Sequence, residues 1–103
     1  MATEVYKVTD NFPRREMYSL TDQMRRAAVS VPSNVAEGQA HHNNGEFLHF
    51  LRHAAGSLGE LETQTLLAEQ LEYAKTTSTH PLLERVHEVG RILNGLIASI
   101  RRQ

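Results

Sequence analysis

The chain has 103 residues, of which 40% are hydrophobic and 22% charged, a balance that excludes a disordered protein and leaves room for one domain over residues 1–103. It contains no cysteine, which excludes a disulfide framework, thiolate zinc sites and a cysteine nucleophile. The net charge is −1 and the pI is 6.6, so nucleic-acid binding would have to come from a local basic patch.

The N-terminal residues do not resemble a targeting segment, because they lack both the basic region and the apolar region of a signal peptide. No apolar run approaches the roughly 18 residues that a membrane-spanning helix needs. We therefore expect a soluble, cytoplasmic protein without a membrane partner.

The first predicted element is a short helix over residues 1–10. It ends at Asn11-Phe12-Pro13, since a residue before proline is pushed out of the helical region of backbone space. Pro13 suits the first turn of a new helical piece.

The second predicted helix begins at Ser19, with Asp22 in a pattern like a capping box. Pro32 lies inside it and should kink or open it locally, because proline removes one backbone hydrogen bond. Gly38 is expected to end the helix, followed by a polar loop to Asn43. One apolar face is formed by Leu20, Met24, Ala27, Val31 and Val35.

The third predicted helix begins after Asn43, which should cap it together with Glu46. It is expected to reach Tyr73 or Ala74, a length of about 45 Å at about 1.5 Å per residue. An unbroken apolar stripe runs along Phe47, Phe50/Leu51, Ala54, Leu58, Leu61, Thr65 and Ala68.

The fourth predicted helix is capped by Thr79, with Pro81 in its first turn and Arg101 and Arg102 at its C-terminal end. Its apolar residues repeat at close to 3.5 residues, the period of helix bundles. They are Leu82/Leu83, Val86, Val89, Leu93, Leu96/Ile97 and Ile100.

Strand signals are missing, so the fold class is all-α. Long helices joined by short turns are antiparallel neighbours, and the predicted architecture is an antiparallel up-down four-helix bundle with a shortened first helix.

Leucines outside the core stripe indicate that the chain forms an oligomer. Leu66, Leu67 and Leu71 make the third helix apolar on several sides, and such a helix is buried on several sides. The short first helix cannot cover it, so either another subunit does or a longer first helix is missing.

Three segments carry a resemblance to a known family: Tyr6-Lys7-Val8-Thr9 with Phe12-Pro13, the run from Leu20 to Gly38, and the run from Gly56 to Gln64. Together they resemble the four-helix-bundle proteins encoded in intervening sequences of 23S rRNA genes, and the same fold is similar to the accessory protein of diversity-generating retroelements. The resemblance covers Tyr6 to about Ile100. It implies a homo-oligomeric ring, a pentamer, with no known enzymatic activity and with RNA or DNA as the usually suggested partner.

Two polar strips are interpreted as structural. Polar side chains on the second helix share one side of it, as do others on the third helix, and we expect the two strips to meet and hydrogen-bond. Asn34 or Ser30 would then satisfy groups that Pro32 leaves without partners. The strips comprise Ser30, Ser33, Asn34 and Glu37 on the second helix, and Ser57, Glu60 and Gln64 on the third.

Histidines suggest metal sites, but their spacing argues against them. Glu46/His49 and Glu84/His87 have the Glu-x-x-His spacing of di-iron bundles, yet their helix starts should lie about 40 Å apart by helical rise. A second cluster, at His41, His42, His49 and His53, lacks a third fixed ligand. We therefore expect no metal and no cofactor.

The best basic feature is a pair of arginine doublets, Arg14-Arg15 and Arg25-Arg26. These four are the candidate nucleic-acid contacts. Adjacent helical residues point about 100° apart, so one arginine of a doublet can pair internally while the other faces solvent.

The leading hypothesis is a non-enzymatic homo-oligomeric bundle that binds a macromolecule, RNA or DNA first, and no small-molecule substrate. The alternative is a purely structural or protein-binding ring without nucleic-acid affinity. A metal-dependent enzyme is the third hypothesis.

Overall fold

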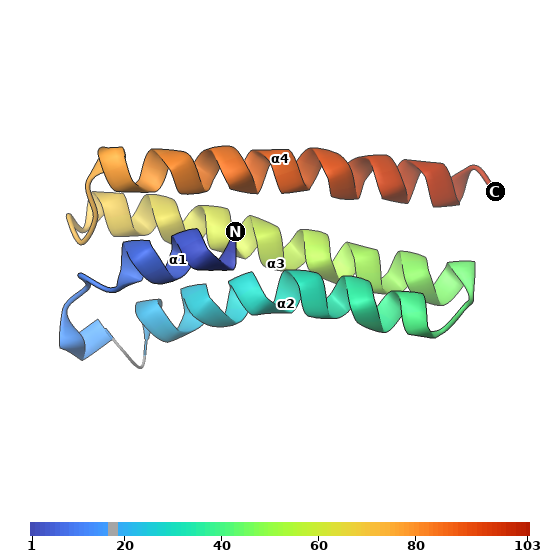
Figure 1. The fold of residues 1–103 in the computed structure, drawn as a ribbon, viewed down its shortest axis with the longest axis horizontal. Coiled ribbons are helices and arrows are strands. Elements are labelled where there is room, and N and C mark those ends of the chain that lie inside the picture. The colour runs from blue at the N-terminus through green and yellow to red at the C-terminus, as the bar shows by residue number, and fades with distance from the viewer. Residues whose placement is uncertain (17–18) are drawn as a thin grey trace.

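The computed structural model describes residues 1–16 and 19–103, and the described part is helical, without a strand (Figure 1). The elements are α1 (Ala2–Thr9), the 3-10 helix η1 (Arg14–Glu16), α2 (Leu20–Ala40), α3 (Asn44–Gln70) and α4 (Thr76–Arg101). The predicted all-α class with a short first helix is confirmed.

The helices form an antiparallel bundle. α3 packs against both α2 and α4, and α1 packs against α2 and α4. α1 runs opposite to those two helices and lies along only one half of them, so beyond Met1 nothing from α1 stands between α2 and α4 (Figure 1).

The core is a continuous apolar cluster to which all four helices contribute. Val5, Met24, Leu51, Leu61 and Leu82 are each fully buried, one or more from each helix. The stripes predicted on α3 and on the first half of α4 therefore face the core.

α2 begins after Ser19, as predicted, but its predicted end is wrong. The helix continues past Gly38 to Ala40, and the left-handed residue that follows is His42, with φ of 52°. Pro32 lies inside α2, and the helix runs past it from Leu20 to Ala40 without interruption.

Gly38 is needed for packing rather than for a turn. It is buried, its φ is not positive, and a Cβ placed on it would lie 2.9 Å from Phe47 Cδ1 and 2.9 Å from Phe50 Cβ. Its bare Cα lets the last turns of α2 approach the first turns of α3.

The predicted N-terminal end of α3 is confirmed, whereas its predicted C-terminal end is wrong. The Asn43 cap is confirmed, because its side chain accepts a hydrogen bond from the Glu46 amide at 3.1 Å. The C-terminal end comes earlier than predicted, at Gln70. Glu72 takes a left-handed φ of 60°, and the Tyr73 amide donates to the Ala68 carbonyl at 2.9 Å, a Schellman ending built without glycine.

α4 begins before its predicted cap. The N-cap residue is Lys75, and Thr79 lies inside the helix, fully buried. Its hydroxyl donates to Glu69 Oε1 near the end of α3. Thr79 therefore joins the two helices across their turn, and Pro81 falls after the first turn.

Within residues 1–16 and 19–103, no helix has a stretch both long enough and apolar enough to span a bilayer.

Candidate interaction surfaces

The two predicted polar strips meet at one point in the middle of α2 and α3. The hydroxyls of Ser30 and Ser57 share a hydrogen bond of 2.8 Å. Asn34 Nδ2 donates to the Ser30 carbonyl at 2.8 Å and to the Ser30 hydroxyl at 2.9 Å. These three half-buried side chains hydrogen-bond to one another, and the contact between Ser30 and Ser57 bridges the helices.

The other members of the strips are not part of that network. Glu37 Oε1 lies 3.6 Å from His41 Nε2, one turn further along α2. Glu60 and Gln64 line a shallow polar depression beside Ser57, and Gln64 Oε1 is buried with no hydrogen-bond partner among the described residues.

The proposed link between this network and Pro32 is wrong. In an α-helix the amide that proline lacks would bind the carbonyl four residues earlier, which here belongs to Ala28. Asn34 donates instead to the carbonyl of Ser30, so it does not satisfy the group that Pro32 leaves free.

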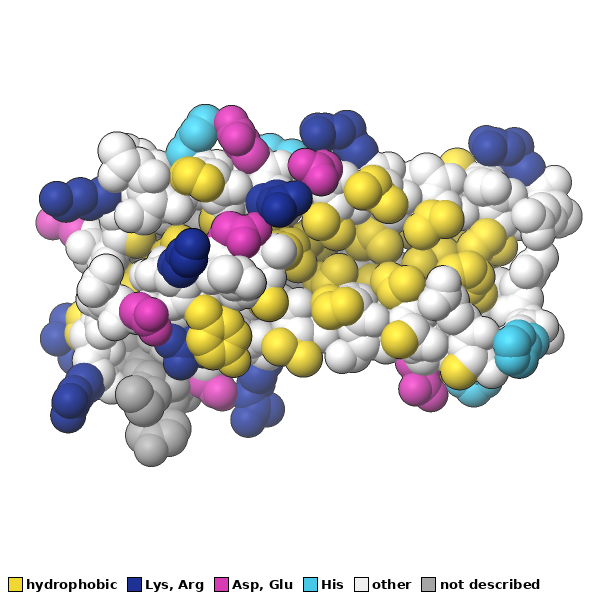
Figure 2. Space-filling view, viewed as in Figure 1, with side chains coloured by type: hydrophobic (Ala, Val, Ile, Leu, Met, Phe, Trp, Pro, Cys, Tyr) yellow, Lys and Arg dark blue, Asp and Glu magenta, His cyan; other side chains and the backbone are white. Residues whose placement is uncertain are grey.

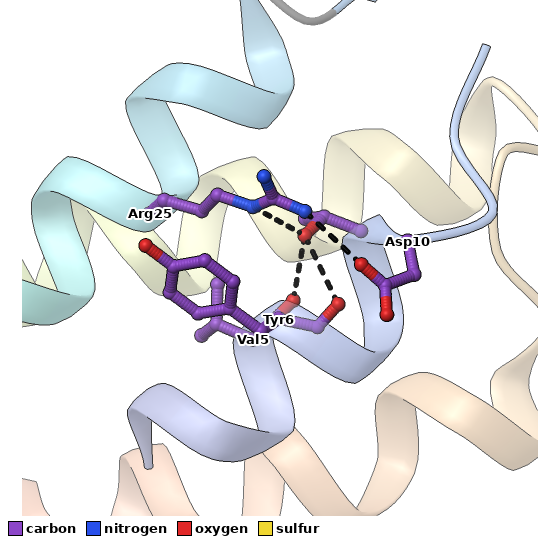
Figure 3. A network of polar contacts seen from close by, with 5 residues as sticks. Val5, Tyr6, Asp10 and Arg25 are labelled. Carbon is purple, nitrogen blue, oxygen red and sulfur yellow. Dashed lines mark hydrogen bonds and ion pairs between the residues drawn. The ribbon is translucent and has the colours of Figure 1, made fainter. Parts of the chain in front are cut away.

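Arg25 is held by α1. Its Nε donates to Thr9 Oγ1 at 3.0 Å, its Nη2 pairs with Asp10 Oδ1 at 3.3 Å, and its guanidinium lies 4.4 Å from the centre of the Tyr6 ring (Figure 3). Thr9 Oγ1 in turn donates to the Val5 carbonyl at 2.9 Å. Arg25 therefore ties α1 to α2 and is poorly placed to bind phosphate.

The other three arginines of the doublets are more accessible. Arg26 is 80% exposed at its side chain, where Nε pairs with Asp22 Oδ2 at 2.8 Å. Arg15 lies over the Tyr73 ring at 5.8 Å, and Arg14 is exposed. Because η1 packs against α2, these three side chains belong to one end of the bundle.

The histidines pair with aromatic rings and carboxylates. The rings of His49 and His53 are 4.6 Å apart, and His41 stacks on Phe50 at 5.3 Å. His87 Nε2 lies 2.6 Å from Glu62 Oε2 on α3, and Glu84 Oε1 pairs with His80 Nε2 at 3.0 Å. Within the part of the chain that the structure describes, no three His, Asp or Glu side chains are grouped to hold a metal ion.

The three predicted interface leucines lie on the outer side of α3. Leu66, Leu67 and Leu71 are 44%, 42% and 47% exposed. At about 100° per residue they fall opposite the buried stripe that includes Leu61 and Thr65. We call this the leucine face of α3.

A second exposed apolar surface was not predicted from the sequence. Val31 is buried in the core and Val35 and Val89 pack against it, as predicted, while Leu96, which was also assigned to a core stripe, is 38% exposed. Together with the exposed Ile92, these residues line an open groove between α2 and α4. The groove lies beside the N-terminal end of α1, and Met1, Ala2 and Thr3 are part of its lining. The mismatch in length between the first helix and its neighbours was the signal that pointed to it.

The sequence model of the 23S rRNA-intervening sequence protein family matches residues 1–95 of the chain. No curated protein is similar enough to the chain to count as a match.

Proposed function

Because the chain belongs to the 23S rRNA-intervening sequence protein family, we propose that it is a non-enzymatic, homo-oligomeric scaffold, assembled as a pentameric ring, whose leading partner is RNA or DNA. The similarity to the accessory protein of diversity-generating retroelements stays a prediction.

The observation that carries self-assembly is the leucine face. Three leucines near the C-terminal end of α3 are exposed to about the same degree, and a monomer would leave their apolar surface in water. Burying apolar surface contributes about 25 cal/mol per Å². A ring forms when such a surface meets a different surface of the next subunit and the rotation closes.

Two glycines on the same side of α3 support this proposal. Gly59 stands at i−7 from Leu66, and Gly56 at i−11 from Leu67, so both share the side of the leucines. A Cβ at either position would meet nothing within 4 Å, so the subunit alone gives no packing reason for glycine. Since glycine inside a helix costs about 0.5–1 kcal/mol relative to alanine, a close approach by another subunit explains both.

Gly59→Ala should therefore have opposite effects on the subunit and on the assembly. The subunit should gain about 0.5–1 kcal/mol in helix stability. Assembly should weaken about tenfold or more, because overpacking a contact costs about 1–3 kcal/mol and 1.4 kcal/mol is about tenfold. Light scattering over a dilution series measures this effect.

The control is Gly95→Ala, on the exposed side of α4, where a Cβ also meets nothing within 4 Å. It offers the same gain in helix propensity and should leave assembly unchanged. If Gly59→Ala assembles as tightly as the unmodified chain, the leucine face is not the interface.

Nucleic-acid binding is proposed at the end of the bundle that carries Arg14, Arg15 and Arg26. One subunit offers few cations and the chain is weakly acidic, but a ring repeats the same patch in every subunit. Weak single contacts then add through avidity.

Replacing Arg14 and Arg26 by alanine should weaken retention of RNA or DNA by the intact oligomer and reduce its dependence on salt, because each neutralised phosphate releases counterions. The original candidate Arg25 should not be replaced in this test, since its loss would loosen α1. Binding is measured by filter retention from low to high salt. If the unmodified oligomer retains neither RNA nor DNA at low salt, nucleic acid is not its partner.

The alternative function is a structural or protein-binding ring without nucleic-acid affinity. It is favoured by one observation: the most extensively bonded of the four candidate arginines is used inside the chain. Under this alternative, Leu66, Leu67 and Leu71 still form the contact between subunits. Arg14, Arg15 and Arg26 then bind no nucleic acid.

A further inference from the structure

Two histidines on α3 have neither a hydrogen bond nor an ion pair with any other described residue. His49 and His53 are exposed, and their rings contact each other and the Phe50 ring. Figure 2 shows histidine side chains, in cyan, at the end of the bundle where α2 leads into α3. Three of the other four histidines lie within 3.6 Å of a carboxylate oxygen, namely His41, His80 and His87. The ring nitrogens of His49 and His53 are therefore open to another ligand.

The helix fixes how these two imidazoles lie. His49 and His53 are four residues apart in a continuous helix, so they stand one above the other on the same side of α3. Leu51 and Ala54 are fully buried, which holds α3 in a rotation that leaves both histidines exposed. Zinc proteases bind their metal with histidines at these two positions, because both imidazoles then reach one ion.

The separation of the two rings fits one metal ion between them. The ring centroids of His49 and His53 are 4.6 Å apart, and the ring planes are inclined at 72°. Two imidazoles that bind one metal at about 2.0–2.1 Å have centroids about 4.5 Å apart when they meet at a right angle, and about 5.2 Å apart when they meet at a tetrahedral angle. The observed separation lies at the right-angled end, which is the arrangement of neighbouring ligands in tetragonal and octahedral sites.

We propose that His49 and His53 bind one divalent ion of a late transition metal, with Cu²⁺ bound most tightly and Ni²⁺ and Zn²⁺ less tightly. Imidazole is a ligand that these metals favour, and Cu²⁺ stands highest in their general order of affinity. Mg²⁺ and Ca²⁺ should not bind, since they prefer oxygen ligands. The proposal goes beyond self-assembly and nucleic-acid binding. It depends on neither, because both ligands come from one helix of one subunit.

The site leaves coordination positions open. Within residues 1–16 and 19–103, no third His, Asp or Glu side chain is grouped with the pair, as the histidine spacing indicated. Structural metal sites are closed by protein ligands, whereas sites with fewer protein ligands keep water on the metal. The ion is therefore exchangeable, and the fold does not require it.

The surroundings of the pair select the kind of metal. His49 and His53 line an open hollow of about 300 Å³, which leaves room for water ligands. The hollow is also lined by Arg52 and Glu60, whose charges are of opposite sign. Because these charges offset each other, the attraction for an ion comes from the imidazole nitrogens rather than from net charge. Such a site favours a late transition metal over a cation that is held by charge alone.

The test is titration of the whole unmodified chain with Cu²⁺ and, separately, with Ni²⁺, measured by calorimetry in a buffer that does not chelate metals. Saturable binding of one ion per chain is expected. Losing a group that only supports a metal ligand costs about 10–100-fold in affinity, so His49→Ala or His53→Ala should weaken binding about tenfold or more. The electron paramagnetic resonance spectrum of bound Cu²⁺ should show two nitrogen ligands in the unmodified chain and one in either variant.

His87→Ala is the matched control. It removes an imidazole that lies 2.6 Å from a Glu62 oxygen, outside the proposed site, so metal affinity should not change. Arg52→Ala removes a positive charge from the hollow and should tighten binding by about two- to fivefold, the range of an exposed charge pair. Circular dichroism of each variant shows whether the helices are retained.

Two results would overturn the proposal. If the unmodified chain showed no saturable binding of Cu²⁺ or Ni²⁺, the two imidazoles would not act together on one ion. If His49→Ala and His53→Ala both bound the metal as tightly as the unmodified chain, the ion would be held elsewhere on the molecule.

Discussion

Leu67→Glu should convert the assembled protein to folded monomers. Within one subunit the Leu67 side chain is 42% exposed, so a glutamate there can reach water and the helix is retained. In an interface built on the leucine face, the same carboxylate would be buried without a partner. Removing a charge from water in this way costs several kcal/mol, so association should weaken by about a hundredfold or more.

Light scattering gives the mass, and circular dichroism shows whether the subunit remains helical. Val29→Glu is the matched control, because it places the same charge at an equally exposed apolar position of α2 and should leave the mass unchanged. A Leu67→Glu protein that keeps the mass of the unmodified oligomer would contradict assembly through α3. If the variant unfolds, Gly59→Ala still tests the same surface without adding a charge.

The order and type of the helices could be predicted because the apolar residues repeat with helical period. Leu51, Leu58 and Leu61 on α3 are buried as that period requires. The Asn43 cap was also predictable, since it needs only the amide of Glu46, three residues along the chain. Interactions between residues this close in the chain can be predicted from the sequence.

Helix ends that depend on a distant segment were predicted wrongly. Thr79 resembles a cap in its local sequence, but its hydroxyl binds Glu69 on the preceding helix. Gly38 resembles a helix end, yet its small size serves the contact with Phe47 and Phe50. In both cases the decisive partner is brought close only by the fold.

The exposed surfaces were also predicted only where they depend on local sequence. Arg25 and Arg26 are adjacent residues of the same type. In the fold, Thr9 and Asp10 lie beside Arg25 and bind it, whereas Arg26 remains exposed. Leu66, Leu67 and Leu71 could be separated from the core by periodicity alone. The groove could not be predicted from periodicity, because Leu96 has the same spacing as the buried Leu93 and yet is 38% exposed.

Gly38→Ala should destabilise the bundle by about 1–3 kcal/mol, the usual cost of overpacking a close contact. The new Cβ would stand 2.9 Å from Phe47 Cδ1, the movable edge of a ring, and 2.9 Å from Phe50 Cβ, which is fixed to the backbone. A ring can rotate away, but relieving the second contact requires the ends of α2 and α3 to separate. For a chain of this size each kcal/mol lowers Tm by about 4–8 °C.

Gly95→Ala is the same chemical change with the opposite expected sign. The added methyl group meets no atom within 4 Å, so only the gain in helix propensity remains, about 0.5–1 kcal/mol. Thermal and urea unfolding of both variants, at one protein concentration, measures the difference. If Gly38→Ala were as stable as Gly95→Ala, α2 and α3 would not be held at close approach at this end. Gly38 would then act through its backbone, as the sequence first indicated.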